Sequence, residues 1–345
     1  MMRFSFSRTA AVLAVLVLGL FAAAPVAAET AADFYKGKVV KLVVGYGAGG
    51  GYDLYARMLA PHLEQRLGAT VVVENRPGGG GMVAISQLAG AEPDGLTLVL
   101  ANLEAAALGQ ILDSPGIRFD VRELPVVARV GSEPKVVLLG AGAPFRTIAD
   151  LQAAERPVKW AAGGKTDGIG DSIAIFSQAL ELRSEIIIGY KGTKEAALAA
   201  GRGETDGLVA SAGSARPLAA GTDLRAVAVL ARQRSALVPE VPTIFEIVEL
   251  DSAQAWWIDY RAGLTDLGRT FIVSPGTPAE RLAVLREAAA AVLNDPAVLA
   301  EAEATQRPIE HGAPEAVEAL IAQSINALGA AEVERVRDVI LNKYY

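Results

Sequence analysis

The chain has 345 residues, 52% of them hydrophobic and 21% charged, with 39 acidic side chains against 32 Lys and Arg. The lack of cysteine excludes disulfides, thiolate metal sites and cysteine nucleophiles, and two histidines are too few for a three-histidine metal site. The formal net charge of −7 argues against nucleic-acid binding, which depends on basic side chains. This length and composition predict a soluble α/β protein with two domains.

The N-terminus has the pattern of a secretory signal. Arg3 and Arg8 precede an apolar stretch at residues 10–24, and small residues at the −3 and −1 positions place a cleavage site after Ala28. The alternative is an uncleaved anchor, but a membrane span needs about 20 apolar residues and this run is shorter. We therefore expect residues 1–28 to be a signal peptide and the remaining chain to be exported.

Short β-branched runs then alternate with amphipathic, alanine-rich segments. This alternation predicts parallel sheets with helices on both faces. The expected strands are residues 39–44, 70–73, 96–100, 135–139, 158–162, 185–188, 207–210 and 224–231. The expected helices are residues 53–67, 147–154, 172–180, 193–200, 278–293, 296–305 and 314–328, the last three each beginning at a proline.

A glycine-rich loop at residues 45–53 lies between the first strand and the first helix. Gly45, Gly47 and Gly50 satisfy G-x-G-x-x-G, and Glu74 ends the next strand, as in a dinucleotide site. The same loop can instead bind a carboxylate or phosphate through backbone amides and the positive end of the helix dipole. Asp53 fits the first turn of that helix either as a structural cap or as a ligand contact.

A second such loop at residues 163–172 also follows a strand and opens a helix. Its Gly-Lys-Thr run resembles a phosphate-binding P-loop, but Lys159 stands where that motif requires glycine. No G-x-S-x-G nucleophile motif is present either. We therefore expect no catalytic residues, no cofactor and no metal, and an anion-binding turn in place of a nucleotide hydrolase site.

Several blocks, in order, resemble the periplasmic substrate-binding receptors of tripartite tricarboxylate transporters, the Bug family. The resemblance extends from about residue 39 to about residue 320. The matching blocks are Gly-Gly-Gly-Tyr-Asp at 49–53, Asn-Arg-Pro-Gly at 75–78, Pro-Asp-Gly at 93–95, Gly-Tyr-Lys-Gly at 189–192, Arg-Gly-Glu-Thr-Asp-Gly at 202–207, Val-Pro-Glu-Val-Pro-Thr at 238–243 and Pro-Gly-Thr-Pro at 275–278.

The resemblance implies a two-lobed periplasmic binding protein of the type II-like, Venus-flytrap form, each lobe a mostly parallel sheet flanked by helices. On this basis residues 29–130 and 233–345 would form lobe 1, and residues 131–232 lobe 2. Such a receptor closes over a small carboxylate ligand and delivers it to membrane permease subunits. We expect it to act as a monomer.

The family also implies a set of ligand-binding positions. From lobe 1 these are Tyr46, Ala48, Gly49, Gly50, Tyr52, Asp53 and Asn102. From lobe 2 they are Gly164, Thr166, Asp171, Ser172, Tyr190, Lys191 and Asp206.

Two departures from the family pattern bear on the ligand. The first loop lacks the usual prolines before its glycines, and Tyr52 replaces the hydroxyl residue that usually precedes Asp53. The stretch at residues 165–167 is more polar than usual. Two other functions remain open: an exported NAD(P)-dependent oxidoreductase that uses the loop from Gly45 to Gly50, and a ligand sensor with the receptor fold.

Overall fold

The computed structural model describes residues 31–221 and 223–345, so the predicted signal peptide lies outside the described residues. Two five-stranded sheets form the centre of the molecule. In chain order the strands are β1 (Val39–Val44), β2 (Thr70–Asn75), β3 (Thr97–Asn102), β4 (Val126–Gly131), β5 (Lys135–Gly140), β6 (Val158–Ala161), β7 (Ser184–Ile187), β8 (Gly207–Ser211), β9 (Leu224–Val229) and β10 (Arg269–Ile272).

The first sheet has the strand order β2-β1-β3-β10-β4. Strand β1 pairs in parallel with β2 and β3, whereas β10 runs antiparallel to both of its neighbours, β3 and β4. The second sheet, β7-β6-β8-β5-β9, has the same plan. There β6 pairs in parallel with β7 and β8, and β5 runs antiparallel to β8 and β9.

Helices connect the parallel strands and cover both sheets. They are α2 (Ala31–Tyr35), α3 (Gly51–Leu67), α4 (Met82–Ala89), α5 (Leu103–Ile111), α6 (Ile148–Gln152), α7 (Gly170–Ala179), α8 (Thr193–Gly201), α9 (Ala212–Gly221), α10 (Ile244–Ile247), α11 (Ser252–Gly263), α12 (Ala279–Leu293), α13 (Pro296–Ala304), α14 (Pro314–Ile325) and α15 (Ala330–Asp338). Shorter helical turns are η1 (Gly79–Gly81), η2 (Val121–Glu123), η3 (Thr265–Leu267) and η4 (Val339–Lys343).

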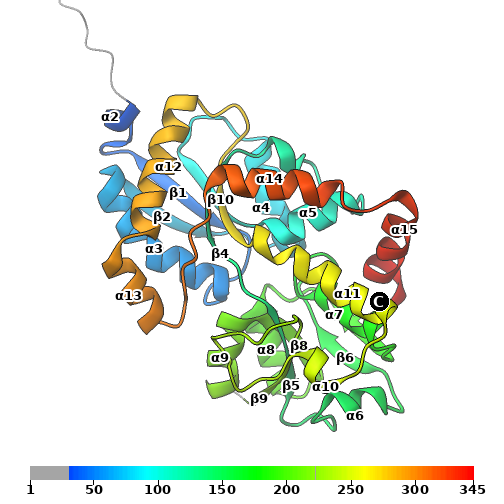
Figure 1. The fold of residues 1–345 in the computed structure, drawn as a ribbon. Helices are drawn as coiled ribbons and strands as arrows, with labels where there is room; N and C mark the ends of the chain where they lie inside the picture. Colours follow the sequence, from blue (N-terminus) through cyan, green and yellow to red (C-terminus); the bar gives the residue numbers. More distant parts are fainter. Residues whose placement is uncertain (1–30, 222) are drawn as a thin grey trace, which may run out of the picture.

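The two sheets and their helices form two lobes, one above the other in Figure 1. The chain passes from the first sheet to the second in the short connection between β4 and β5, and it returns through α10 and α11 to β10. Because β10 inserts between β3 and β4, the first lobe is completed only by this returning segment. The two-lobed α/β architecture is therefore confirmed, but the expectation of mostly parallel sheets is wrong in detail. Each sheet is mixed, because β10 in the first and β5 in the second run antiparallel to both of their neighbours.

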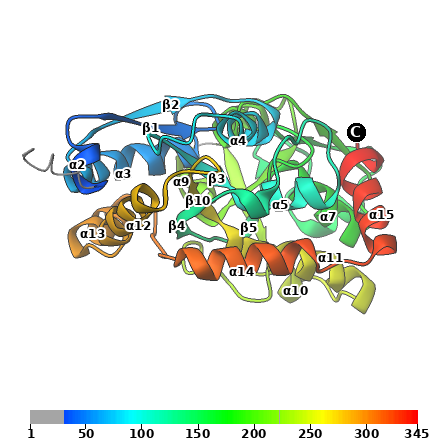
Figure 2. The same cartoon turned by 90° about the horizontal axis from the view of Figure 1, so that it is seen from above.

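The C-terminal part of the chain contacts both lobes. Helix α14 packs on α5 and β4 of the first lobe, whereas η4 packs on α7 of the second. The main-chain N–H of Ile186 in β7 donates to the carbonyl of Tyr344 at 2.7 Å. Figure 2 shows α14 extending along one side of the molecule, with α15 at its far end near α7. The predicted lobe boundaries at 130/131 and 232/233 stay a prediction.

One cluster of buried apolar side chains continues from lobe to lobe. It includes Ile272 of the first sheet, Leu108 of α5, Phe176 of α7 and Trp160 of the second sheet, each almost fully buried. A separate cluster lies in each lobe on the other face of its sheet. Among the described residues, no helix combines the length and the apolarity needed to cross a bilayer.

We expect Phe271→Ala in β10 to lower the free energy of unfolding by about 3–5 kcal/mol, because the ring is fully buried and its loss leaves a cavity. Denaturant unfolding followed by circular dichroism measures the change. The matched control is Val39→Ala at the start of β1, where the side chain is 52% exposed and the cost should stay within about 0.5 kcal/mol. Equal effects of the two substitutions would contradict the role of β10 in closing the sheet.

Candidate functional site

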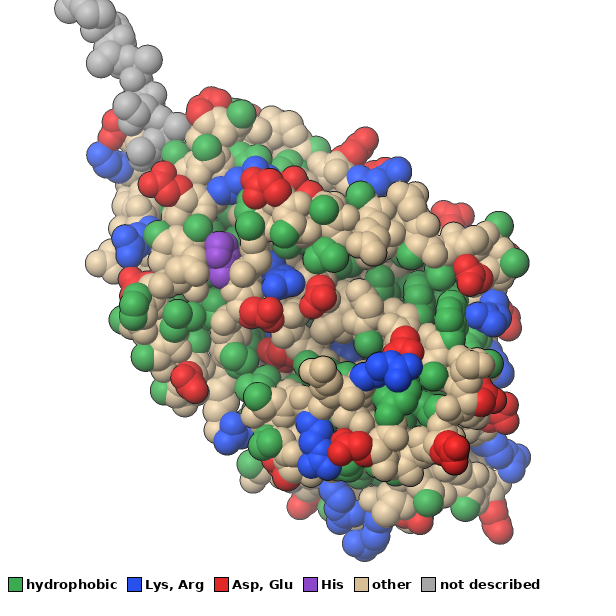
Figure 3. All heavy atoms as spheres, in the orientation of Figure 1, with side chains coloured by type: hydrophobic (Ala, Val, Ile, Leu, Met, Phe, Trp, Pro, Cys, Tyr) green, Lys and Arg blue, Asp and Glu red, His purple; other side chains and the backbone are tan. Residues whose placement is uncertain are grey.

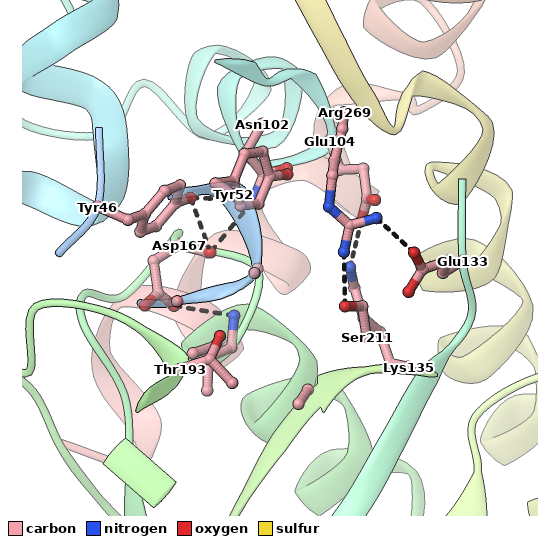
Figure 4. A pocket seen from close by; sticks show the side chains of 15 residues that line it. Tyr46, Tyr52, Asn102, Glu104, Glu133, Lys135, Asp167, Thr193, Ser211 and Arg269 are labelled. Carbon is pink, nitrogen blue, oxygen red and sulfur yellow. Dashed lines mark hydrogen bonds and ion pairs between the residues drawn. The ribbon is translucent and has the colours of Figure 1, made fainter. Parts of the chain in front are cut away.

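A pocket lies between the two lobes. It is formed where β1 and β3 of the first sheet and β8 of the second end at their carboxyl edges, the usual ligand position in open α/β sheets. Figure 4 shows the side chains that converge there. They are Tyr46, Tyr52, Asn102, Glu104, Glu133, Lys135, Asp167, Thr193, Ser211 and Arg269.

The first glycine loop brings the N-terminus of α3 to this pocket. Gly50 is the N-cap residue, and the first intrahelical bond runs from the N–H of Leu54 to its carbonyl at 3.0 Å. The N–H groups of Gly51 and Tyr52 therefore have no acceptor within the helix, and both residues line the pocket. This arrangement presents the positive end of the helix dipole to a bound anion.

Two tyrosines and an asparagine form the first-lobe wall of the pocket. The rings of Tyr46 and Tyr52 lie 4.8 Å apart between centroids. Asn102 caps α5 by accepting from the N–H of Ala105, and its Nδ2 donates to the hydroxyl of Tyr46 at 3.2 Å. Burial raises the pKa of the Tyr46 hydroxyl well above its usual value, so this group is a neutral hydrogen-bonding partner at neutral pH.

Arg269 of β10 is buried in the centre of the site. Its Nη1 donates to Glu133 at 2.7 Å, and its Nη2 donates to the Ser211 hydroxyl of β8 at 2.7 Å, so one guanidinium contacts both lobes. The group also lies over the rings of Tyr52 and Tyr55. Its Nε is buried and has no hydrogen-bond partner in the structure. An anion in the pocket could supply the missing acceptor.

A second buried ion network lies beside the first. Glu104 of α5 pairs with Lys135 of β5 at 2.8 Å and with Arg261 of α11 at 2.9 Å. Arg261 also pairs with Asp171 of α7 at 2.8 Å. Elements of both lobes therefore share a chain of alternating charges, whose members balance one another inside the protein.

The pKa values of the two glutamates follow from these contacts. Burial alone would raise the pKa of Glu133, but Arg269, the Gly213 amide and the Tyr55 hydroxyl outweigh it and hold the pKa below the usual range. For Glu104 burial is likewise outweighed, here by Lys135 and Arg261. Both glutamates are therefore ionised at neutral pH.

The second glycine loop is filled by one of its own side chains. The carboxylate of Asp167 accepts from the main-chain N–H groups of Gly163 at 2.7 Å, Ile169 at 2.9 Å and Gly170 at 2.6 Å. Three amides that could cradle an external anion are thus already occupied. Burial, with a smaller contribution from Asp171, raises the pKa of Asp167 to about 6, although the amide bonds oppose this shift.

The lobes also touch directly beside the pocket. The N–H of Gly47 in the first lobe donates to the carbonyl of Lys191 in the second at 2.6 Å. The main-chain carbonyl of Asp167 accepts from Asn102 at 3.2 Å and from the Tyr46 hydroxyl at 3.4 Å. The structure therefore represents a closed arrangement of the two lobes.

The sequence-predicted site residues fall into three groups. Those that line the pocket are Tyr46, Gly50, Tyr52 and Asn102. Those that line two adjoining grooves are Ala48, Gly49 and Lys191. Those that line none of these are Asp53, Gly164, Thr166, Asp171, Ser172, Tyr190 and Asp206.

The third group is engaged in local structure. Asp53 accepts from the Gly49 amide at 2.7 Å, as a cap of the first loop, and pairs with Arg57 at 2.9 Å. Asp206 forms a two-bond pair with Arg156, each bond 2.7 Å long. Their part in ligand binding stays a prediction, since their carboxylates have these partners already.

The same holds for the other polar members of that group. Ser172 donates to the carbonyl of Gly168 at 2.7 Å, while Asp171 accepts from the Gly168 amide at 3.0 Å. Both therefore shape the turn that opens α7. The Tyr190 main-chain N–H donates to Ala162 at 3.3 Å, which ties its loop to β6.

Sequence reasoning missed the charged residues of the pocket, chiefly Glu133, Lys135 and Arg269. Their signal was a charged residue at the start of an otherwise apolar strand: Lys135 opens β5, and Arg269 opens β10. Strand β10 itself was not predicted, because four residues after a glycine give too short a pattern. Within residues 31–221 and 223–345, no group of three or more His, Asp or Glu side chains is placed to hold a metal ion.

We expect Glu133→Gln to lower the free energy of unfolding at pH 7 by about 3 kcal/mol, because it leaves the buried Arg269 charge without its partner. The folded-state pKa of Glu133 is depressed, so its contribution is fully present above about pH 5 and is lost as the pH falls through the folded pKa. The unfolding midpoints of wild type and of the Glu133 variant, measured from pH 7 downward, should therefore converge. Glu315→Gln, at a side chain 75% exposed, is the control and should follow wild type at every pH.

Comparison with known proteins places the chain in a family. Residues 55–340 match the family model described as the tripartite tricarboxylate transporter family receptor. A UPF0065 protein of Bordetella bronchiseptica is 28% identical over 279 residues, which cover 77% of this chain and 76% of the relative. Protein BugT of Bordetella pertussis is 30% identical over 238 residues, covering 67% of this chain and 72% of BugT.

Solved structures agree on the fold. The periplasmic binding protein BugD superposes with a TM-score of 0.73 at 23% identity, covering 89% of this chain and 99% of BugD. MatC from Rhodopseudomonas palustris, solved with bound malate, gives a TM-score of 0.72 at 22% identity, covering 88% of this chain and 99% of MatC. Together with the two-lobed fold, the family match shows that this chain belongs to the tripartite tricarboxylate transporter receptors of the Bug family.

Proposed function

We propose that this chain is a periplasmic solute receptor that binds a small carboxylate between its lobes and delivers it to the membrane permease of a tripartite tricarboxylate-type transporter. The observation that carries the proposal is a set of unused donors in one pocket. The N–H groups of Gly51 and Tyr52 have no acceptor within α3, and the buried Nε of Arg269 has no partner. A carboxylate satisfies such donors without any catalytic group.

Relatives support the class of ligand. MatC was solved with malate, and a further R. palustris protein with a TM-score of 0.71 was solved with adipate. The family description supports a permease partner, and the predicted signal peptide supports the periplasm. In this proposal lobe 1 comprises residues 29–130 and 233–345, lobe 2 comprises residues 131–232, and the receptor acts as a monomer.

An apolar groove beside the pocket offers space for the rest of the ligand. It adjoins the first loop and is lined by Leu54 and Tyr55 of α3, Leu198 of α8 and Pro217 of α9. Its volume is about 890 Å³ with its opening. Acidic and basic side chains are interspersed on the face in Figure 3, so the ligand's charge must be recognised locally.

The alternative of a dinucleotide-dependent oxidoreductase has less support. Its ribose-binding acid would be Glu74, which pairs with Arg76 at 2.5 Å. The Gly47 amide of the fingerprint donates across to Lys191. A nicotinamide dinucleotide titration distinguishes the two functions, because only the oxidoreductase would bind it tightly.

We expect carboxylates to stabilise the protein in a thermal-shift screen of di- and tricarboxylates, aromatic acids and the matching amides. A ligand at about 100 times its Kd adds about 2.7 kcal/mol to the free energy of unfolding, and the amides should add nothing. If no carboxylate raises Tm, the proposed function is wrong.

We expect Gly50→Val to abolish carboxylate binding and to leave the fold intact. A Cβ at this position would meet only the Gly47 carbonyl, at 3.4 Å, while the branched side chain would fill the mouth of the pocket. Isothermal titration calorimetry measures the loss. Gly142→Val is the control, since that glycine is exposed, has open space around it and lies outside the pocket. Retained affinity in the Gly50 variant would remove the first loop from the site.

A further inference from the structure

We propose that Asp167 occupies the place of a second ligand carboxylate, so that this receptor selects monocarboxylates over dicarboxylates. The inference rests on the proposed function, because it assigns the substrate class of the same site. It follows from the contacts of Asp167, from its position between the lobes and from the charge balance of the pocket.

The contacts of Asp167 are those of a bound anion. Both carboxylate oxygens are used: Oδ2 accepts from the amide of Gly163, and Oδ1 accepts from the amides of Ile169 and Gly170. These amides belong to the turn that leads into α7, so the carboxylate also lies at the positive end of that helix dipole. No further carboxylate can use these three donors while Asp167 holds them.

The position of Asp167 makes this occupancy part of the ligand site. Asp167 lines the pocket, is 2% exposed, and faces the first lobe. Its main-chain carbonyl accepts from Asn102 and from the Tyr46 hydroxyl, both of which also line the pocket. Gly80 of the first lobe has φ +65°, and a Cβ there would clash with the Asp167 side chain. These contacts hold the turn that carries Asp167 against the first-lobe wall of the pocket.

The ion pairs around the pocket leave the charge of Asp167 without a cationic partner among the described residues. Glu133 is neutralised by Arg269, and Glu104 is neutralised by Lys135. Asp167 forms no ion pair with a basic side chain among the described residues, and with a pKa of about 6 it is ionised at pH 7. One ligand carboxylate can use the first-lobe amides and the Nε of Arg269. A second carboxylate would meet the charge of Asp167 in a buried site, where repulsion is strong.

The test compares straight-chain mono- and dicarboxylates of equal length, such as hexanoate and adipate, by isothermal titration calorimetry at pH 7. We expect the wild-type protein to bind the monocarboxylate more tightly. We expect Asp167→Ala to shift the affinity ratio toward the dicarboxylate by about tenfold or more, because the freed amides can bind the second carboxylate.

Two further variants control the result. Asp150→Ala removes a carboxylate that likewise accepts from two amides, of Arg146 and Thr147, but caps α6 far from the pocket, so it should leave the ratio unchanged. Asp167→Asn removes the charge and keeps one oxygen acceptor for the Ile169 and Gly170 amides, although its NH2 group cannot accept from Gly163. This variant serves if the alanine variant fails to fold. It should weaken the discrimination by removing the repulsion.

The outcomes separate this inference from the proposed function. Equal affinity of wild type for the two series, or an unchanged ratio in the folded Asp167 variants, overturns the inference alone and leaves Asp167 as a helix cap. The absence of binding by any carboxylate of either series overturns the proposed function and the inference with it.

Discussion

The site depends on the hydrogen bonds and the ion pair that the buried guanidinium of Arg269 forms. This group lies on the one strand of the first sheet that is contributed by the returning chain, and it bonds to Glu133 in the connection between the lobes and to Ser211 in the second sheet. A charge in such a position is tolerated only when its partners are fixed, because removing it from water costs several kcal/mol. The same contacts therefore join the lobes and set the electrostatics of the pocket.

Backbone amides provide the other anion-binding donors at the two glycine loops. The chain has no cysteine and two histidines, and its glycines gather in loops at the carboxyl ends of the strands. In the first lobe such a loop exposes the first N–H groups of α3 to the pocket. In the second lobe the equivalent loop is closed on Asp167. Of two loops with similar composition, the first therefore leaves its amides available to an external anion, whereas the amides of the second already bind the Asp167 carboxylate.

Much of this could be predicted from residues adjacent in sequence. The alternation of β-branched and alanine-rich segments indicated most strands but missed helices such as α4, α5, α9 and α11. The first glycine loop was expected at the site, and the family resemblance implied its individual positions, of which Gly50 and Tyr52 line the pocket. Strands β4 and β10 were missed, since β10 has only four residues and Arg129 interrupts the apolar run of β4. Asp53 and Asp206 match the family's motifs in sequence, but in the fold their carboxylates bond to Arg57 and Arg156 and line none of the grooves between the lobes.

The sequence by itself determined the two-lobed α/β class, the family and the use of glycine loops in place of reactive side chains, because these depend on local periodicity and on short motifs. Only the tertiary structure decided which charges meet. Glu133 and Arg269 are 136 residues apart, and Glu104 and Arg261 are 157 apart, so no local pattern relates them. That Asp167 fills its own amide cradle also depends on a folded turn, since the direction of a side chain is fixed by the backbone around it and not by its identity.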